Sequence, residues 1–264
     1  MKYIYIFLSF LILCSCGQYR AYQKVLKSED PEFKYSQAVN YYENQDYARS
    51  LQLFEDLLAS FKNSERAEDI YYRYIYCNYH MKDYISAAYH AKNFSSKFIL
   101  SPKKEEIEFV TAMCYYLDSP RYNLDQKSTY KAISELQLFI DKYPETEKLD
   151  QINSLMLELN QKLEKKYFEI AKLYYDTGKF QAAISAIDNY LEDFPETSFL
   201  ENINFIQIQS YYELGKNSVD EKKQQRIKEA IFACNNFLIA FPSGEYEEEA
   251  KIIYEKLKVI QNGL

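Results

Sequence analysis

Five stretches of the chain repeat one pattern of small, apolar and aromatic positions. Each has a small residue, apolar side chains four and seven residues later, and an aromatic side chain four residues after those. The small positions are Ser50, Ala87, Ala132, Ala183 and Ala230, and the aromatic positions are Phe61, Phe98, Tyr143, Phe194 and Phe241. Steps of four, three and four residues keep side chains on one face of a helix. The pattern therefore predicts five helices that pack along the same stripe.

A further helix is predicted before each of these five. The clearest precedes Gly178, in the segment KYFEIAKLYYDTG, where Ala171 and Tyr174 keep helical spacing. Glycine accepts the left-handed conformation of a tight turn, so Gly178 is expected to close that helix. Prolines follow three of the aromatic positions directly, where they stop a helix: Pro144, Pro195 and Pro242. The chain is thus predicted to be a series of helix-turn-helix units.

Helix-turn-helix units with small and aromatic residues at these offsets resemble the tetratricopeptide repeat. The repeats are irregular, because the chain has no Trp and the small positions lie 37, 45, 51 and 47 residues apart. One such unit cannot bury its apolar face alone, so neighbouring units must stack. We expect an all-α fold, an α-solenoid of about five irregular tetratricopeptide repeats over residues 33–264.

The uneven repeat lengths require insertions or lengthened helices. An insertion is expected at residues 118–128, within the third repeat, where the sequence reads DSPRYNLDQKS. No Gly or Pro interrupts residues 145–177, and apolar residues keep helical spacing through Ile152, Leu159 and Leu163. A single long helix over about 147–177 is therefore predicted to link repeats three and four.

The chain begins with one lysine and an apolar run from Ile4 to Leu13, which then ends abruptly in polar residues. A membrane-spanning helix needs about 20 apolar residues, so this run is predicted to be an export signal over residues 1–15. Leu13-Cys14-Ser15-Cys16 resembles the lipobox of bacterial lipoproteins. The resemblance implies that Cys16 becomes the acylated (palmitate-bearing) first residue and that residues 16–32 form a lipid-anchored tether. An ordinary cleaved signal with an incidental cysteine is the alternative.

Composition argues against some classes of partner and of chemical site. The formal net charge is −7 and no basic stripe is found, so a nucleic-acid partner is not expected. Cys77, Cys114 and Cys234 occupy apolar helical positions and are interpreted as buried small hydrophobic residues. Their spacing suits no metal, and a disulfide among three would leave one unpaired.

Residue patterns for catalysis are missing from the sequence. The chain has no glycine-rich phosphate loop and no recognisable nucleophile–histidine pair, and it contains two histidines. The acidic run at Glu245–Ala250 lacks the alternation of a calcium loop and is interpreted as a charged first helical turn. We therefore expect no catalytic residue, no metal site and no cofactor, and interpret the chain as a binding protein rather than an enzyme.

Tyrosines are the most abundant candidate contact residues. In the segment DIYYRYIYCNYH, Tyr72, Tyr76 and Tyr79 share one helical face, whereas Tyr71 and Tyr74 share another. Together with Tyr41, the first three are candidates for an aromatic peptide groove: Tyr41, Tyr72, Tyr76 and Tyr79. The alternative is core packing with tyrosine hydroxyls at the rim, and both can hold.

A lipobox followed by five irregular tetratricopeptide repeats resembles the BamD family, the lipoproteins of the outer-membrane β-barrel assembly machinery. The most specific segments are DYARSLQLFEDLL, CYYLDSPRYNLDQKSTYKAISELQLFIDKYPET and KYFEIAKLYYDTGKFQAAISAIDNYLEDFPET. The third-repeat insertion falls where this family carries one, which makes its residues candidates: Arg121, Tyr122, Asn123 and Asp125.

The resemblance implies a scaffold at the periplasmic face of the outer membrane, held in the lipid bilayer by acylated Cys16. Its C-terminal repeats would bind the periplasmic domains of the barrel-forming assembly subunit. Its N-terminal repeats would contact unfolded outer-membrane protein precursors. Two alternatives stay open: a periplasmic tetratricopeptide lipoprotein for envelope division or wall synthesis, and a small SusD-like glycan-binding lipoprotein. The latter family favours Trp in its sugar sites, and this chain has none.

Overall fold

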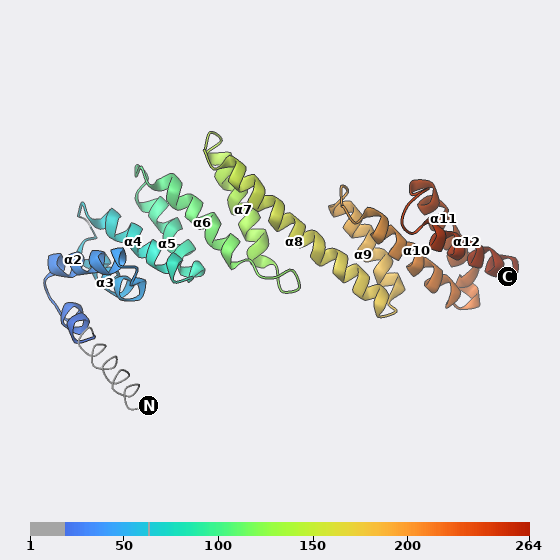
Figure 1. Cartoon of the computed structure of the whole chain (residues 1–264), viewed down its shortest axis with the longest axis horizontal. Helices are drawn as coiled ribbons and strands as arrows, with labels where there is room; N and C mark the ends of the chain where they lie inside the picture. Colours follow the sequence, from blue (N-terminus) through green and yellow to red (C-terminus); the bar gives the residue numbers. More distant parts are fainter. Residues whose placement is uncertain (1–18, 63) are drawn as a thin grey trace, which may run out of the picture. The chain divides into compact units, whose positions relative to one another are not determined.

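The computed structural model describes residues 19–62 and 64–264, and the elements within these ranges are helices (Figure 1). Residues 19–26 are helical, and the longer helices that follow are α2 (Pro31–Glu43), α3 (Tyr47–Ser60), α4 (Ala67–His80), α5 (Tyr84–Lys97), α6 (Lys104–Asp118), α7 (Lys127–Lys142), α8 (Leu149–Asp176), α9 (Phe180–Asp193), α10 (Leu200–Lys216), α11 (Asp220–Ala240) and α12 (Glu247–Asn262). Within residues 19–62 and 64–264, no helix is both long and apolar enough to cross a membrane.

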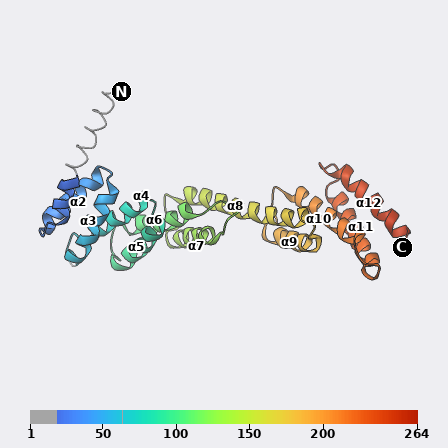
Figure 2. The ribbon, with the colours of Figure 1, turned by 90° about the horizontal axis from the view of Figure 1, so that it is seen from below.

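The chain divides into two compact units. Unit 1 contains the described residues up to Pro120 together with Asp125–Met156, and unit 2 contains Arg121–Leu124 and Leu157–Leu264. Within each unit, helices that follow one another in the sequence pack side by side, which both views show for α2 to α7 and for α9 to α12 (Figures 1 and 2). Each unit is an α-solenoid of tetratricopeptide-like helical pairs, which confirms the predicted fold class.

The repeated stripe forms the core of both units. The five small positions lie on α3, α5, α7, α9 and α11, and every one of them has no exposed surface. The apolar residues seven positions later are at most 3% exposed: Leu57, Phe94, Phe139, Tyr190 and Phe237. A small side chain at the first position lets the backbone of the neighbouring helix approach, and the larger side chains fill the space beside it. The predicted packing stripe is confirmed.

Each of these five helices ends at the aromatic residue of the pattern. Phe61, Phe98, Tyr143, Phe194 and Phe241 are the C-terminal caps, and the backbone N–H of each donates to the carbonyl four residues earlier. The rings stay at the edge of the core, as in the contact of Phe98 with Phe94, whose centroids are 4.8 Å apart. The same position thus ends the helix and extends the apolar stripe beyond it.

Three helix pairs share one tight turn. Gly178 between α8 and α9 has a φ of +73°, and the same left-handed conformation occurs at Gln45 (φ 61°) and Lys82 (φ 64°). In each turn, the left-handed residue donates its N–H three residues back, and the next N–H donates five residues back, with N···O distances of 2.8–3.0 Å. This hydrogen-bond pair is the Schellman motif, which satisfies carbonyls at the end of a helix.

Helix α8 is a single 28-residue helix over the stretch where the sequence predicts one. Its residues up to Met156 belong to unit 1, and those from Leu157 belong to unit 2. In unit 2, Ala171 of α8 is fully buried against Ile187, Tyr190 and Ile203. The hydroxyl of Tyr190 donates to Glu164 of α8 at 3.2 Å. The end of α8 therefore acts as the first helix of the repeat that α9 completes.

Residues 19–26 differ from the tether predicted over residues 16–32. They form a helix whose Tyr22 and Val25 are 6% and 5% exposed, in the same core as α3 and α4. The Tyr22 hydroxyl donates to Gln52 Oε1 at 2.6 Å, and the guanidinium of Arg49 lies 5.6 Å from the Tyr22 ring centroid. An apolar, hydrogen-bonded face holds this segment on the first repeat, so it is part of the folded body.

The three shared turns give a test of backbone strain. We expect Gly178→Ala to lower the free energy of unfolding by about 1 kcal/mol, because an L residue is strained at positive φ. No atom lies within 4 Å of the added methyl group, so a steric clash does not contribute. Lys82→Gly should instead raise the free energy of unfolding by about 0.5 kcal/mol, since glycine relieves the strain there. Urea unfolding followed by circular dichroism measures both changes in the free energy of unfolding. Changes of the same sign in the two variants would contradict the assignment of both residues to the left-handed conformation.

Candidate functional site

Three of the four predicted groove tyrosines form a ladder on α4. The ring centroids of Tyr72 and Tyr76 are 4.8 Å apart, and those of Tyr76 and Tyr79 are 6.1 Å apart. Helix spacing places them on one face, which packs toward α6. The hydroxyls of Tyr72 and Tyr76 both donate to Glu106 Oε1 of α6, at 2.8 and 2.5 Å. Their rings are partly exposed, but their hydroxyls serve to join two helices.

Burial and this shared carboxylate stabilise the neutral phenols. Burial, followed by the hydrogen bond to Glu106, raises the pKa of Tyr72 to about 12. The same causes raise the pKa of Tyr76 further still. The Lys103 ammonium lies 4.2 Å from the Tyr72 ring centroid, so a cation also covers part of the ladder. The surface it presents is therefore ring edges and faces rather than free hydroxyls.

Tyr41 lies apart from the ladder. Its ring packs edge-on against Tyr22, with centroids 5.7 Å apart, and the Arg49 guanidinium lies 5.8 Å from it. Tyr42, which is not among the predicted groove tyrosines, is closer to α4, because Arg73 lies 5.0 Å from its ring centroid. The helical register of α2 decides which of two adjacent tyrosines faces α4, and no residue pattern in the sequence distinguishes them.

The other tyrosine face of α4 packs against α5. Tyr71 and Tyr74 are 9% and 8% exposed and surround His90, whose ring centroid lies 5.8 and 4.8 Å from theirs. The Tyr71 hydroxyl lies 3.2 Å from His90 Nδ1. Burial lowers the pKa of His90, despite the opposing effects of Glu55 and Asp83. For this face the core-packing interpretation is confirmed.

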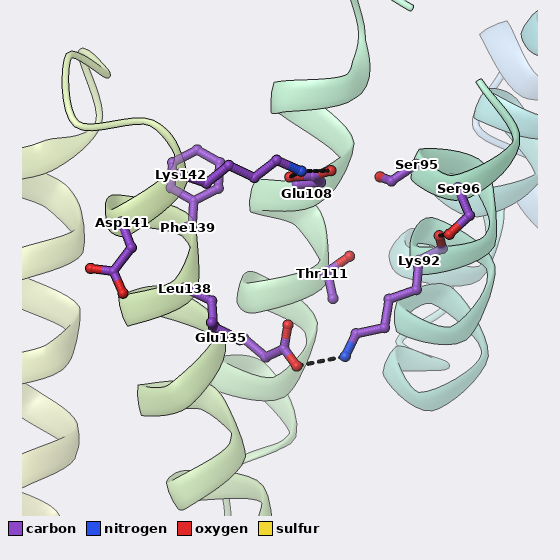
Figure 3. A pocket seen from close by; sticks show the side chains of 10 residues that line it. All are labelled: Lys92, Ser95, Ser96, Glu108, Thr111, Glu135, Leu138, Phe139, Asp141 and Lys142. Atoms are coloured by element: carbon purple, nitrogen blue, oxygen red, sulfur yellow. Dashed lines mark hydrogen bonds and ion pairs between the residues drawn. The ribbon is translucent and has the colours of Figure 1, made fainter. Parts of the chain in front are cut away.

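A pocket of about 600 Å³ lies between α5, α6 and α7, and half of the residues that line it are charged (Figure 3). Two ion pairs cross it: Lys92 Nζ to Glu135 Oε1 at 2.5 Å, and Lys142 Nζ to Glu108 Oε1 at 2.6 Å. Both cations that line the pocket are therefore already bound to carboxylates of neighbouring helices. These ion pairs join α5 and α6 to α7 and leave little charge for a ligand.

An apolar groove lies between α10 and α12 in unit 2, with a volume of about 680 Å³. Its apolar lining is Tyr212 of α10 with Ile252, Val259 and Ile260 of α12. Ile252 and Val259 are 54% and 72% exposed, although the opposite face of α12 is already buried through Ala250, Ile253 and Leu257. Large aliphatic side chains on a solvent-facing groove are typical of a binding surface.

This groove is not among the sites predicted from the sequence. Ile252 and Val259 are seven residues apart, which is a signal for one helical face. The same helix carries a second apolar set at Ile253 and Leu257, and only the packing distinguishes the buried set from the exposed one. Glu248 and Glu255 with Lys251 and Lys256 form a charged rim of mixed sign around the groove.

The third-repeat insertion connects to α8. Lys166 of α8 donates to the carbonyls of Tyr122 and Leu124, at 3.3 and 2.6 Å. Lys165 lies 4.7 Å from the Tyr122 ring centroid. Asp125 accepts the N–H of Lys127 at 3.0 Å, close to the start of α7. Arg121 and Asn123 are exposed, so the insertion presents polar side chains outward and uses its backbone to bind α8.

The three cysteines of the folded units are buried and free of disulfides. Cys77, Cys114 and Cys234 have no exposed surface, as the sequence predicts. Burial raises the pKa of their thiols to about 11, 12 and 11. Cys16, the predicted lipidation site, lies outside the described residues.

Comparison with protein families gives a match to the YfiO model, described as an outer membrane lipoprotein, over residues 27–227. A curated relative, the outer membrane protein assembly factor BamD of Caulobacter vibrioides, is 26% identical over 142 residues. That alignment covers 54% of this chain and 47% of the relative, so the chain spans about half the length of the curated protein it matches.

Solved structures of tetratricopeptide proteins are similar at low identity. A repeat protein from Bacteroides fragilis is 14% identical, with 88% of this chain and 100% of that chain covered and a TM-score of 0.37. The TPR2AB domain of yeast Sti1, in its complex with pHSP90, is 12% identical, with 86% and 98% covered and a TM-score of 0.41.

The shared carboxylate of the tyrosine ladder gives one prediction. We expect Glu106→Ala to lower the free energy of unfolding by about 1–3 kcal/mol, because two half-buried hydroxyls lose their acceptor. Glu145→Ala, on an exposed loop, is the matched control and should change it by less than about 0.5 kcal/mol. Urea unfolding measures both. Equal effects of the two substitutions would show that Glu106 does not support the ladder.

His90 gives a prediction of pH dependence. Because its folded pKa is lowered, the neutral ring favours the fold, and protonation below about pH 6.5 favours unfolding. The free energy of unfolding should therefore fall between about pH 7 and pH 5 in the natural chain. His90→Gln, which keeps an acceptor for Tyr71, should reduce that fall. Unfolding curves at several pH values test this, and a fall of unchanged size would assign it to other groups, such as His80, whose pKa burial also lowers.

Proposed function

Because this chain belongs to the outer membrane lipoprotein family of the YfiO model, we propose that it is a scaffold of outer-membrane β-barrel assembly. Membership supports a role in outer-membrane protein assembly in general. The finer proposal is a non-catalytic protein that binds the barrel-forming assembly subunit and helps to receive and insert barrel precursors. Stacked repeats suit this work, because they offer long surfaces to other proteins.

The apolar groove between α10 and α12 is the observation that carries the proposal. It belongs to the C-terminal repeats, through which the barrel-forming subunit is proposed to bind. Exposed Ile252 and Val259 would insert between apolar side chains of that partner, and Tyr212 would contribute a large ring with a polar end. The mixed charges at the rim would then fix the orientation of the partner more than its affinity.

The N-terminal repeats are the proposed contact for unfolded precursors. Tyr72, Tyr76 and Tyr79 would offer ring faces to extended segments, while Glu106 holds two of the hydroxyls in place. Tyr41 is a separate contact on the first repeat. The insertion residues Arg121, Tyr122, Asn123 and Asp125 stay a candidate surface of their own.

We also propose that Cys16 carries the acyl chains that hold the protein at the periplasmic face of the outer membrane. One acyl chain binds a bilayer weakly, whereas two or more hold a protein stably. A scaffold fixed in this way stays beside a partner that is itself embedded in the membrane.

The groove can be tested by co-purification from detergent-solubilised outer membranes. We expect Ile252→Glu with Val259→Glu to reduce recovery of the barrel-forming subunit roughly tenfold or more, because two carboxylates would be placed in an apolar contact. Ile239→Glu on α11 is the matched control, since Ile239 is 70% exposed and does not line the groove.

Three other results would contradict parts of the proposal. Full recovery with the groove variant would place the contact elsewhere on the chain. Failure of the natural chain to recover any barrel-assembly subunit would overturn the assembly function itself. Normal barrel-protein levels with chained cells after depletion would favour a role in division or wall synthesis.

A further inference from the structure

We propose that the outward face of the helix at residues 19–26 binds the anionic headgroups of a lipid bilayer and so fixes which edge of unit 1 faces the membrane. The inference rests on the proposed acylation of Cys16 in one respect, namely that a bilayer is close by. It goes further in assigning a second, ionic contact to residues of the folded body.

The helix is docked on one side and free on the other. Tyr22 and Val25 are buried in the core of unit 1, and Tyr22 makes a hydrogen bond of 2.6 Å to Gln52. Tyr19, Arg20 and Lys24 are exposed, with Tyr19 at 58%. The docked side therefore holds the other side in a fixed direction.

The exposed side of this segment carries three cations. Arg20 and Lys24 lie four residues apart on the helix, and Lys27 follows three residues later, directly after the end of the helix, so the three cations extend along the same side. None of them forms an ion pair within the described ranges, although most cations on the neighbouring repeats do. No acidic residue occurs from Gly17 to Ser28, in a chain whose formal net charge is −7. A local run of three cations is complementary to an anionic surface.

The short covalent link to Cys16 limits how far this face can lie from the bilayer. Cys16 and Tyr19 are three residues apart, and three residues span at most about 11 Å even when fully extended. An acyl-bearing Cys16 at the headgroup level therefore places the start of the helix within about one Debye length of the lipid phosphates. At that distance Lys and Arg are attracted to anionic lipids, and Tyr19 suits the interface through its polar ring.

The contact would give unit 1 a defined orientation. Residues 19–26 pack near the turn between α2 and α3, through Tyr41 and Arg49. The loop between α5 and α6 lies at the other end of these antiparallel helices (Figure 1). That loop carries Leu100, which is 96% exposed. The α2–α3 turn should therefore lie near the membrane, and Leu100 should point away from it.

The absence of Trp makes the test direct, because a single substitution supplies the only tryptophan signal. We would place Tyr19→Trp and, as the matched control, Leu100→Trp in separate copies of the full acylated chain. Each is reconstituted into phosphatidylethanolamine vesicles with phosphatidylglycerol, and into neutral phosphatidylcholine vesicles. Acrylamide quenching then reports exposure to water, and quenching by brominated lipids reports contact with the bilayer.

We expect acrylamide quenching of the Tyr19→Trp protein to fall about threefold in anionic vesicles relative to neutral ones, with brominated-lipid quenching rising in parallel. High salt, or Arg20→Glu with Lys24→Glu and Lys27→Glu, should abolish the difference, because both remove the ionic attraction. The Leu100→Trp protein should be quenched equally in all vesicles. Circular dichroism of each variant checks that the fold is kept.

The inference would be overturned if the Tyr19→Trp protein were protected from acrylamide equally in neutral and anionic vesicles. It would also be overturned if that protection remained after charge reversal. In either case the acyl chains alone would account for the attachment. Protection of the Leu100→Trp protein as well would overturn the proposed orientation. None of these results bears on the proposed assembly function, which co-purification tests separately. An unmodified mass at Cys16 would instead contradict the anchor in the proposed function.

Discussion

Close approach of helices at five small residues is the constraint on which the rest of the structure depends. Ser50, Ala87, Ala132, Ala183 and Ala230 are fully buried where one helix of a repeat meets its neighbours. A larger side chain at such a position would force the backbones apart, since protein interiors are close-packed. The constraint acts over one turn of helix. It therefore leaves the lengths of helices and loops free, as the 28-residue α8 and the 21-residue α11 illustrate.

Much of the fold could be predicted because its signals are local and periodic. The stripe of small, apolar and aromatic residues, the break-free run that becomes α8 and the turn at Gly178 all follow from spacing or from one residue type. The turns at Gln45 and Lys82 could not be predicted in this way, because the left-handed position there holds no glycine. Their conformation is imposed by the packing of the two helices they connect.

The binding surfaces were less predictable, because they depend on contacts between helices. Tyrosine spacing gave the two faces of α4, but the acceptor for Tyr72 and Tyr76 is Glu106, some 30 residues later in the chain. The groove at α12 depends on which of two apolar sets faces inward. The docking of residues 19–26 depends on Gln52 and Arg49 of α3, whereas the lipobox resemblance implied a tether there. In each case the missing information was a partner residue on another helix.

The buried cysteines have a consequence for how the folded chain resists oxidation. A thiol is attacked or oxidised mainly as an accessible thiolate, and burial removes both the access and the charge. Three thiols cannot all pair among themselves, so an unfolded chain always has one left for a mixed disulfide. Stacking of the repeats buries all three thiols. Folding therefore also protects the three thiols from oxidation, and the unfolded chain is the form exposed to wrong crosslinks.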